Sequence, residues 1–305
     1  MRHLLDLAEL DAATFTALLD RADALLAAPR LPDPARAAHT LATVFMEPST
    51  RTRTSMTLAA ARLGLTVVDL DVGGSSKSKG ETDRDTLATL EAQGVELFAL
   101  RSSAPGQPQE LAATLRASSR IISCGEAHLN HPTQGLLDAL TLRQKRPDPA
   151  ASRVLIVGDI AHSRVARSAV QAFRLLGVGD IALAAPSELM PDDPAFEGTT
   201  RFGSLDEALV GRDVIMMLRI QLERMGAGRA PDIASYHRDW GLTAARLAGA
   251  AEDAIVMHPG PFNREIEIAS AVADGPQSVI WQQVRNGVAV RMAVIEAMLA
   301  GADHG

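Results

Sequence analysis

The sequence is poor in cysteine and in aromatic residues, and both shortages restrict what the protein can be. Cys124 is the only cysteine among 305 residues, so a disulfide within the chain is impossible and a cysteine-based metal cluster is implausible. Aromatic residues make up only 3% of the chain, so we expect a core of Leu, Val, Ile, Ala and Met. A lone cysteine fits a reducing compartment, and we predict a cytoplasmic location.

The chain also lacks long apolar runs and an excess of positive charge. No apolar stretch is long enough to span a bilayer, and residues 1–6 do not have the pattern of a signal peptide. The formal net charge of -7 argues against a general nucleic-acid binder. We therefore expect neither a membrane nor a nucleic acid as partner, although local arginines can still bind a small anion.

Apolar runs of strand length alternate with stretches of helical periodicity along the chain. This alternation predicts an α/β fold with two domains, each a parallel sheet flanked by helices. The predicted strands are 41–46, 65–70, 95–100, 119–123, 153–158, 180–184, 213–218 and 254–257. The predicted helices are 11–27, 52–63, 84–93, 108–117, 134–145, 163–176, 205–210, 241–248 and 282–300.

A Pro-rich polar segment at 146–152 precedes a fresh strand and marks the predicted domain boundary. We place the first domain at 1–146 and the second at 147–284. The last stretch, about 285–305, is strongly amphipathic and is predicted to form a C-terminal helix that belongs with the first domain.

Residues 47–55, Glu-Pro-Ser-Thr-Arg-Thr-Arg-Thr-Ser, combine hydroxyl and guanidinium groups at the start of a predicted helix. The first turn of a helix offers unpaired N–H groups and the positive end of the dipole, which favour an anion. Two arginines in the first turn of a helix interact unfavourably with the positive end of the dipole, unless an anion binds there. This pattern predicts a phosphate site, with Arg53 supporting the loop rather than touching the phosphate.

The run Ser-Thr-Arg-Thr-Arg at 49–53 resembles the carbamoyl-phosphate-binding motif of the transcarbamoylase family. His-Pro-Thr-Gln-Gly at 131–135 is highly characteristic of the same family, and the resemblance extends along nearly the whole chain. It favours the aspartate-specific members, since ornithine-specific enzymes usually carry Pro-Cys-Gln after the histidine. In this family the C-terminal helix packs back on the first domain, so we expect the same here.

The resemblance implies roles for residues of the first half. The helix start at His131 disfavours the protonated imidazole, which leaves a neutral N–H donor for the carbamoyl oxygen. Thr52, Arg101, His131 and Lys79 would be catalytic. The carbamoyl phosphate ligands would be Ser49, Thr50, Arg51, Thr52, Ser75, Lys79, Arg101, His131 and Gln134.

Ser75 and Lys79 lie in a loop at 73–82 that is rich in Gly, Ser and Lys and that, by composition alone, resembles a linker. In the family, the matching residues reach the active site of the neighbouring subunit. The resemblance therefore implies a homotrimer with shared sites.

Residues of the second half are implied to bind L-aspartate. The strand at 153–158 lacks the glycine fingerprint of a dinucleotide site and is followed by Arg164 at a helix start. Arg164 would bind the α-carboxylate and Arg219 the side-chain carboxylate. The full set for aspartate would be Lys79, Arg164, Arg219, Gln221, Gly260 and Pro261. An ornithine site would instead need an acidic partner, and the ornithine motif is absent.

The implied reaction transfers the carbamoyl group of carbamoyl phosphate to the amine of L-aspartate, in de novo pyrimidine biosynthesis, without a cofactor or metal. Two alternatives stay open: a transcarbamoylase acting on ornithine or an acylated ornithine, and a catalytically silent scaffold. The sequence also leaves open a regulatory or pathway-enzyme partner. A Cys124–His128 nucleophilic pair is disfavoured because Cys124 belongs to a core strand, and Glu126, His128 and His131 match no metal spacing.

Overall fold

A computed structural model describes residues 1–28, 32–70, 80–221 and 232–300, and the chain forms two compact units. Unit 1 comprises Met1–Leu136 and Asn286–Gly305, and unit 2 comprises Leu137–Arg285. The division runs through two helices, α5 (Pro132–Lys145) and α11 (Ile280–Ala300). The predicted boundary at 146–147 follows α5, whereas the contacts divide the chain inside that helix.

Unit 1 contains a parallel sheet of four strands in the order β2-β1-β3-β4. Its strands are β1 (Thr40–Phe45), β2 (Thr66–Leu70), β3 (Leu97–Ser102) and β4 (Arg120–Glu126). From its second residue on, the central strand β1 is buried, as expected for a parallel strand that helices cover on both faces. The carboxyl ends of β1, β3 and β4 therefore lie along one edge of the sheet.

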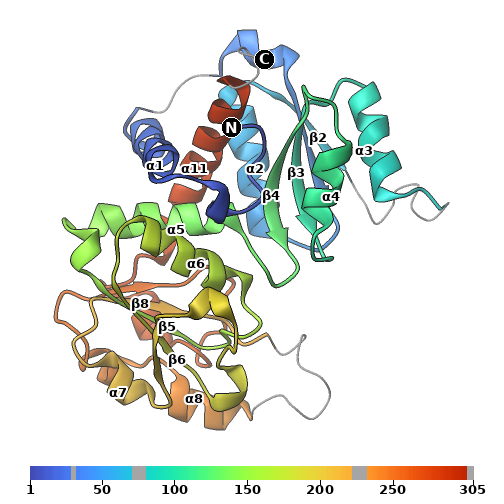
Figure 1. The fold of residues 1–305 in the computed structure, drawn as a ribbon. Coiled ribbons are helices and arrows are strands. Elements are labelled where there is room, and N and C mark those ends of the chain that lie inside the picture. The colour runs from blue at the N-terminus through green and yellow to red at the C-terminus, as the bar shows by residue number, and fades with distance from the viewer. Residues whose placement is uncertain (29–31, 71–79, 222–231, 301–305) are drawn as a thin grey trace. The chain divides into compact units, whose positions relative to one another are not determined.

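Helices cover both faces of this first sheet (Figure 1). Leu87 of α3 and Leu111 of α4 share an apolar cluster with Val44 and Phe98 of the sheet, while α2 and α11 lie on the other side. The helices are α1 (Ala12–Ala27), α2 (Thr50–Leu63), α3 (Asp83–Ala92) and α4 (Gln107–Thr114), with 3₁₀ turns η1 (Leu7–Glu9) and η2 (Pro34–Ala38).

Unit 2 contains a parallel sheet of five strands in the order β7-β6-β5-β8-β9. Its strands are β5 (Arg153–Val157), β6 (Asp180–Ala184), β7 (Thr200–Phe202), β8 (Val214–Met217) and β9 (Ile255–Met257). Its helical segments are η4 (Pro149–Ala151), α6 (Arg164–Leu175), η5 (Ser187–Leu189), η6 (Pro194–Phe196), α7 (Leu205–Leu209), α8 (Ile233–Trp240), α9 (Ala244–Leu247) and α10 (Ser270–Ala273).

The predicted α/β class is confirmed, and each of the eight predicted strands is present. The predictions missed β7, α8 and α10, which are short elements of unit 2. The expected packing of the C-terminal helix on the first domain is also confirmed, since Glu296 of α11 pairs with Arg21 and Arg36. No helix in the described part of the chain is long and apolar enough to cross a membrane.

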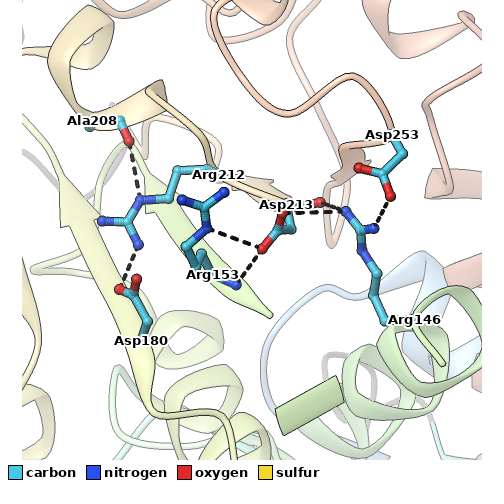
Figure 2. A network of polar contacts seen from close by, with 7 residues as sticks. All are labelled: Arg146, Arg153, Asp180, Ala208, Arg212, Asp213 and Asp253. Atoms are coloured by element: carbon cyan, nitrogen blue, oxygen red, sulfur yellow. Dashed lines mark hydrogen bonds and ion pairs between the residues drawn. The ribbon is translucent and has the colours of Figure 1, made fainter. Parts of the chain in front are cut away.

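A polar network holds the amino end of the second sheet (Figure 2). Asp213, just before β8, accepts hydrogen bonds from Arg153 at its carboxylate (backbone N, 2.8 Å) and from Arg146 at its carbonyl oxygen (2.7 Å). Arg146 also binds Asp253 at 2.5 Å, and Arg212 binds Asp180 at 2.6 Å. These arginines lie at the edge opposite to the carboxyl ends of the strands, so they serve the fold rather than a ligand.

Candidate active site

The first turn of α2 lies a short loop after β1 and carries the predicted phosphate ligands. Ser49 is the N-cap, with an extended backbone, and among the described residues its side chain makes no capping hydrogen bond. Thr50 and Arg51 are exposed and Ser49 is half-buried. The first N–H groups of the helix have no partner within the helix, so this turn offers donors to a phosphate.

Thr52 and His131 lie together where α2 and α5 begin. Thr52 Oγ1 is 3.3 Å from His131 Nε2, and the two residues are 6% and 4% exposed. Gln134, 8% exposed, lies one turn further along α5, and its backbone N–H donates to the carbonyl oxygen of His131 at 2.9 Å. The structure thus brings three of the predicted site residues to one edge of the first sheet.

Arg101 lies near the end of β3, where its register partner in β1 is Phe45. One guanidinium N–H donates to the carbonyl oxygen of Cys124 at 3.2 Å, and Nε lies 3.4 Å from the carboxylate of Glu47. The Arg101 side chain is 12% exposed, so its charge is largely shielded from water. A cation at the carboxyl end of a parallel strand is well placed to meet an anionic ligand.

Arg53 turns away from the first turn of α2 and binds β2. Its Nε donates to Asp69 at 2.6 Å and a terminal nitrogen to the carbonyl oxygen of Leu70 at 3.3 Å. Burial alone would raise the pKa of Asp69, but hydrogen bonds from Arg53 and Thr43 hold the pKa below its ordinary value. Arg53 therefore supports strand β2, and its expected lack of contact with the phosphate stays a prediction.

In unit 2, the loop between β5 and α6 leads to Arg164, the first residue of α6. Gly158 has φ +120, and a Cβ there would lie 2.6 Å from the carbonyl oxygen of Leu218, so only glycine fits this close approach. Ser163 caps α6 by accepting from the N–H of Ala166 at 3.1 Å. The helix then begins with Arg164, which is 7% exposed.

Asp159 joins this loop to the segment after β8, and sequence reasoning missed it. Its side chain is fully buried, with Oδ1 2.7 Å from His162 Nδ1 and Oδ2 accepting from the N–H of Gln221 at 3.3 Å. The amide of Gln221 donates to the carbonyl oxygen of His162 at 3.1 Å. Arg219 is half-buried two residues earlier, so Asp159 orders the segment that carries both predicted aspartate ligands.

The loop after β9 is fixed by a buried histidine. The N–H of Gly260 donates to His258 Nδ1 at 2.9 Å, which assigns the ring hydrogen to Nε2. That nitrogen lies 3.5 Å from Glu267, whose carboxylate also accepts from the N–H of Asn263 at 2.5 Å. Gly260 has φ +62 and is followed by a cis bond to Pro261, so both predicted residues lie on the turn next to this histidine.

Two predicted residues, Ser75 and Lys79, fall at 71–79 and lie outside the described residues. Cys124 is buried in β4, and burial raises the pKa of its thiol to about 12, so it is unsuited to nucleophilic attack. Among the described residues, no group of three or more His, Cys, Asp or Glu is arranged to hold a metal ion.

Residues 2–144 match the family domain described as aspartate/ornithine carbamoyltransferase, carbamoyl-P binding domain. Residues 151–298 match the Asp/Orn binding domain of the same family. The chain is 50% identical over 303 residues to the aspartate carbamoyltransferase catalytic subunit of Xanthomonas campestris pv. campestris (strain B100), covering 98% of this chain and 96% of that protein. The corresponding subunit of Stenotrophomonas maltophilia (strain K279a) is 48% identical over 304 residues, with 98% and 96% covered.

Solved structures are similar over nearly the full length. Aspartate transcarbamoylase from Trypanosoma cruzi in complex with carbamoyl phosphate and aspartate has a TM-score of 0.85 and 29% identity, covering 96% of this chain and 95% of that one. Ornithine carbamoyltransferase from Thermus thermophilus has a TM-score of 0.86 and 24% identity, covering 97% and 98%. Both specificities share this fold, so the side chains of the site must decide between them.

Proposed function

Because the chain belongs to the aspartate/ornithine carbamoyltransferase family, we propose that it carbamoylates L-aspartate. The products are N-carbamoyl-L-aspartate and phosphate, in de novo pyrimidine biosynthesis, and the reaction takes place in the cytoplasm. One observation carries the choice of aspartate over ornithine: Arg164 and Arg219 both follow strands of the second sheet at its carboxyl edge. A dicarboxylate needs cations, whereas the ornithine side chain needs a carboxylate.

Unit 1 binds carbamoyl phosphate. The phosphate oxygens accept hydrogen bonds from the first turn of α2 and from its hydroxyl groups, and Arg51 and Arg101 supply charge-assisted donors. The carbamoyl oxygen faces Thr52, Arg101 and His131. The proposed ligands are Ser49, Thr50, Arg51, Thr52, Arg101, His131 and Gln134, together with Ser75 and Lys79.

Unit 2 binds L-aspartate. Arg164, at the start of α6, pairs with the α-carboxylate, and Arg219 pairs with the side-chain carboxylate. The carbonyl oxygens of Gly260 and Pro261 accept from the amine, which leaves its lone pair free to attack. Gln221 completes the set by holding the segment of Arg219 against the loop of Asp159. Lys79 contributes a further positive charge.

The reaction is a nucleophilic addition followed by loss of phosphate. The aspartate nitrogen forms a bond to the carbamoyl carbon, and the carbonyl electron pair moves to oxygen, where Thr52, Arg101 and His131 stabilise the negative charge. The bond from carbon to the phosphate oxygen then breaks, and the leaving phosphate takes the proton from the amine. Most of the rate enhancement comes from orientation and charge stabilisation, so no strong protein base is needed.

The active assembly is a homotrimer in which Ser75 and Lys79 act in the site of a neighbouring copy. This part of the proposal rests on the family resemblance of the loop at 73–82. Any regulatory or pathway-enzyme partner binds outside the shared sites. Sedimentation of the active enzyme as a monomer would contradict the shared sites.

The direct test supplies the purified protein with carbamoyl phosphate and one amine at a time: L-aspartate, L-ornithine or an acylated ornithine. Ureido product is measured by colorimetry, with Arg51→Ala as the control for contaminating activity. We expect product with aspartate alone. Product with ornithine and none with aspartate would reject the proposal, and no product with any amine would favour a scaffold.

A further inference from the structure

The pairing register of β3 and β4 shifts near their carboxyl ends, and this irregularity lies beside Arg101. Leu100 pairs with Ser123, but Ser102 pairs with Glu126, so β4 has one residue more than β3 over this stretch. Gly125, within the bulge, has φ +120. The bulged carbonyl of Cys124 accepts from the guanidinium of Arg101 at 3.2 Å. A bulge changes the direction of the side chains around it. One of these side chains is Arg101, a proposed substrate ligand.

The turn that follows β4 is strained and leads to His131. Ala127 has φ +41, which is unfavourable for a residue with a Cβ. The turn is closed by backbone hydrogen bonds of 2.9 Å, from the N–H of Glu126 to the carbonyl of Asn130 and from the N–H of Leu129 to the carbonyl of Glu126. The N–H of Ala127 donates to the carbonyl of Ser102 at 2.9 Å, which ties the turn to the end of β3.

Glu126 is the side chain that joins the two loops. Its Oε1 accepts from the N–H of Gly106, in the loop after β3, at 2.6 Å. Its Oε2 accepts from the side-chain amide of Asn130 at 2.8 Å, and Gln109 lies 3.5 Å from the same oxygen. Glu126 and Asn130 are 1% and 2% exposed, so water does not compete strongly for these bonds.

The two residues next to this junction are the proposed ligands of carbamoyl phosphate. Arg101 immediately precedes Ser102 in β3, and His131 immediately follows Asn130. We propose that the buried Glu126–Asn130 pair is a positioning device that fixes Arg101 and His131 relative to each other for carbamoyl phosphate. The inference rests on the proposed function, because it takes these two side chains to bind one substrate.

The test first removes the hydrogen-bond donor of the pair and then exchanges donor and acceptor between the two residues. Asn130→Asp replaces the amide donor by an acceptor, so two carboxylates face each other across 2.8 Å in the present geometry. The double variant Glu126→Gln/Asn130→Asp restores one donor and one acceptor and keeps the acceptor for Gly106. The matched control is Glu91→Gln, because Glu91 is 7% exposed and also accepts from a backbone N–H, that of Arg116, at 3.0 Å.

Two readouts separate positioning from mere stability: the Kd of inorganic phosphate by calorimetry, and KM for each substrate against kcat. For Asn130→Asp we expect phosphate to bind at least about 10-fold more weakly and kcat/KM for carbamoyl phosphate to fall about 100-fold, because small misplacements are costly in catalysis. KM for aspartate should change less than about 3-fold. The double variant should return all values to within about 3-fold of the parent, and Glu91→Gln should not alter them.

A folded Asn130→Asp variant with unchanged phosphate affinity and unchanged KM for carbamoyl phosphate would overturn the inference. If Asn130→Asp does not fold, the double variant decides. A folded double variant whose phosphate affinity is lowered more than about 10-fold would contradict the inference that the hydrogen bond between residues 126 and 130 positions Arg101 and His131. If the parent binds phosphate but transfers no carbamoyl group, the proposed function fails, and the phosphate affinities still test the inference separately.

Discussion

Single residues at strand ends and helix starts carry most of the chemistry proposed for this chain. Arg101 and Arg219 lie at or just after the carboxyl ends of β3 and β8, where parallel sheets present side chains to ligands. Sequence alone located both, because an apolar run that ends in an arginine is easy to recognise. Asp159 was missed although it lies only two residues after the end of strand β5. Its importance comes from a contact with Gln221, which is distant in sequence and therefore invisible to pattern reading.

His3 shows how one side chain can make local stability depend on pH. Its Nδ1 accepts from the N–H of Ile121 at 3.0 Å, and the adjacent residue Leu4 forms a bridge with Ile122 of β4. Burial, with smaller contributions from Arg2 and Arg120, lowers the pKa of His3 to about 4. Because the folded protein binds this proton more weakly than the unfolded chain does, stability falls as the pH drops from about 6.5 towards about 4.

We therefore expect the amide of Ile121 to exchange faster with solvent at pH 5 than at pH 7, after correction for the intrinsic pH dependence of exchange. The variant His3→Asn keeps an acceptor near the same position but does not titrate, so it should lose this extra pH dependence. Hydrogen exchange read by mass spectrometry measures the effect. Equal protection of the His3 protein at both pH values would contradict this explanation.

At the scale of helices and strands, the long apolar patterns predicted the fold well and the short ones did not. Each predicted strand of the two sheets is present because a short segment rich in apolar residues, alternating with helical patterns along the chain, leaves few alternatives. The edge strand β7 (Thr200–Phe202) has only three residues and two of them are exposed, so no apolar pattern identifies it. For α8 a signal existed: Asp232 caps the helix, and Tyr236 and Trp240 recur at helical spacing on its buried side.

Helix α11 is held to unit 1 by a carboxylate shared between two arginines. Glu296 lies 2.5 Å from Arg21 of α1 and 3.1 Å from Arg36 of η2, and its side chain is 11% exposed. Burial alone would raise the pKa of Glu296, but the two arginines outweigh it and hold the pKa below its ordinary value. The contribution to stability is therefore present above the ordinary pKa of glutamate and is lost as the pH falls below it.

Glu296→Gln should lower the free energy of unfolding at pH 7 by about 1–2 kcal/mol, because it weakens two charge-assisted hydrogen bonds. The difference from the parent should shrink as the pH approaches the folded pKa. Urea denaturation at pH 7 and pH 4 measures both effects. Asp274→Asn, which alters the exposed Arg264–Asp274 pair, is the control and should have no measurable effect. If the two variants changed the free energy of unfolding equally, the shared carboxylate would not be what holds α11.

At the scale of the whole molecule, the proposed function assigns one substrate to each of the two units. Sequence motifs assign carbamoyl phosphate to the first half and aspartate to the second, because each half carries its own arginines at strand ends or helix starts, and this assignment stays a prediction. They could not predict the buried connections that order the loops of each unit, such as Glu126 to Asn130 in unit 1 and His258 to Glu267 in unit 2. Those contacts depend on three-dimensional proximity between loops, for which a single sequence has no periodic signal.

The measurement that tests this division most directly is KM for each substrate, with the other saturating, in Arg219→Ala and Arg101→Ala. Arg219→Ala should raise KM for aspartate about 100-fold and leave KM for carbamoyl phosphate within about 3-fold, since a charge-assisted pair is worth roughly 1.5–3 kcal/mol. Arg101→Ala should raise KM for carbamoyl phosphate, and Arg201→Ala, an exposed arginine on β7, should change neither. If Arg219→Ala raised KM for both substrates equally, or KM for carbamoyl phosphate alone, the assignment of one substrate to each unit would be wrong.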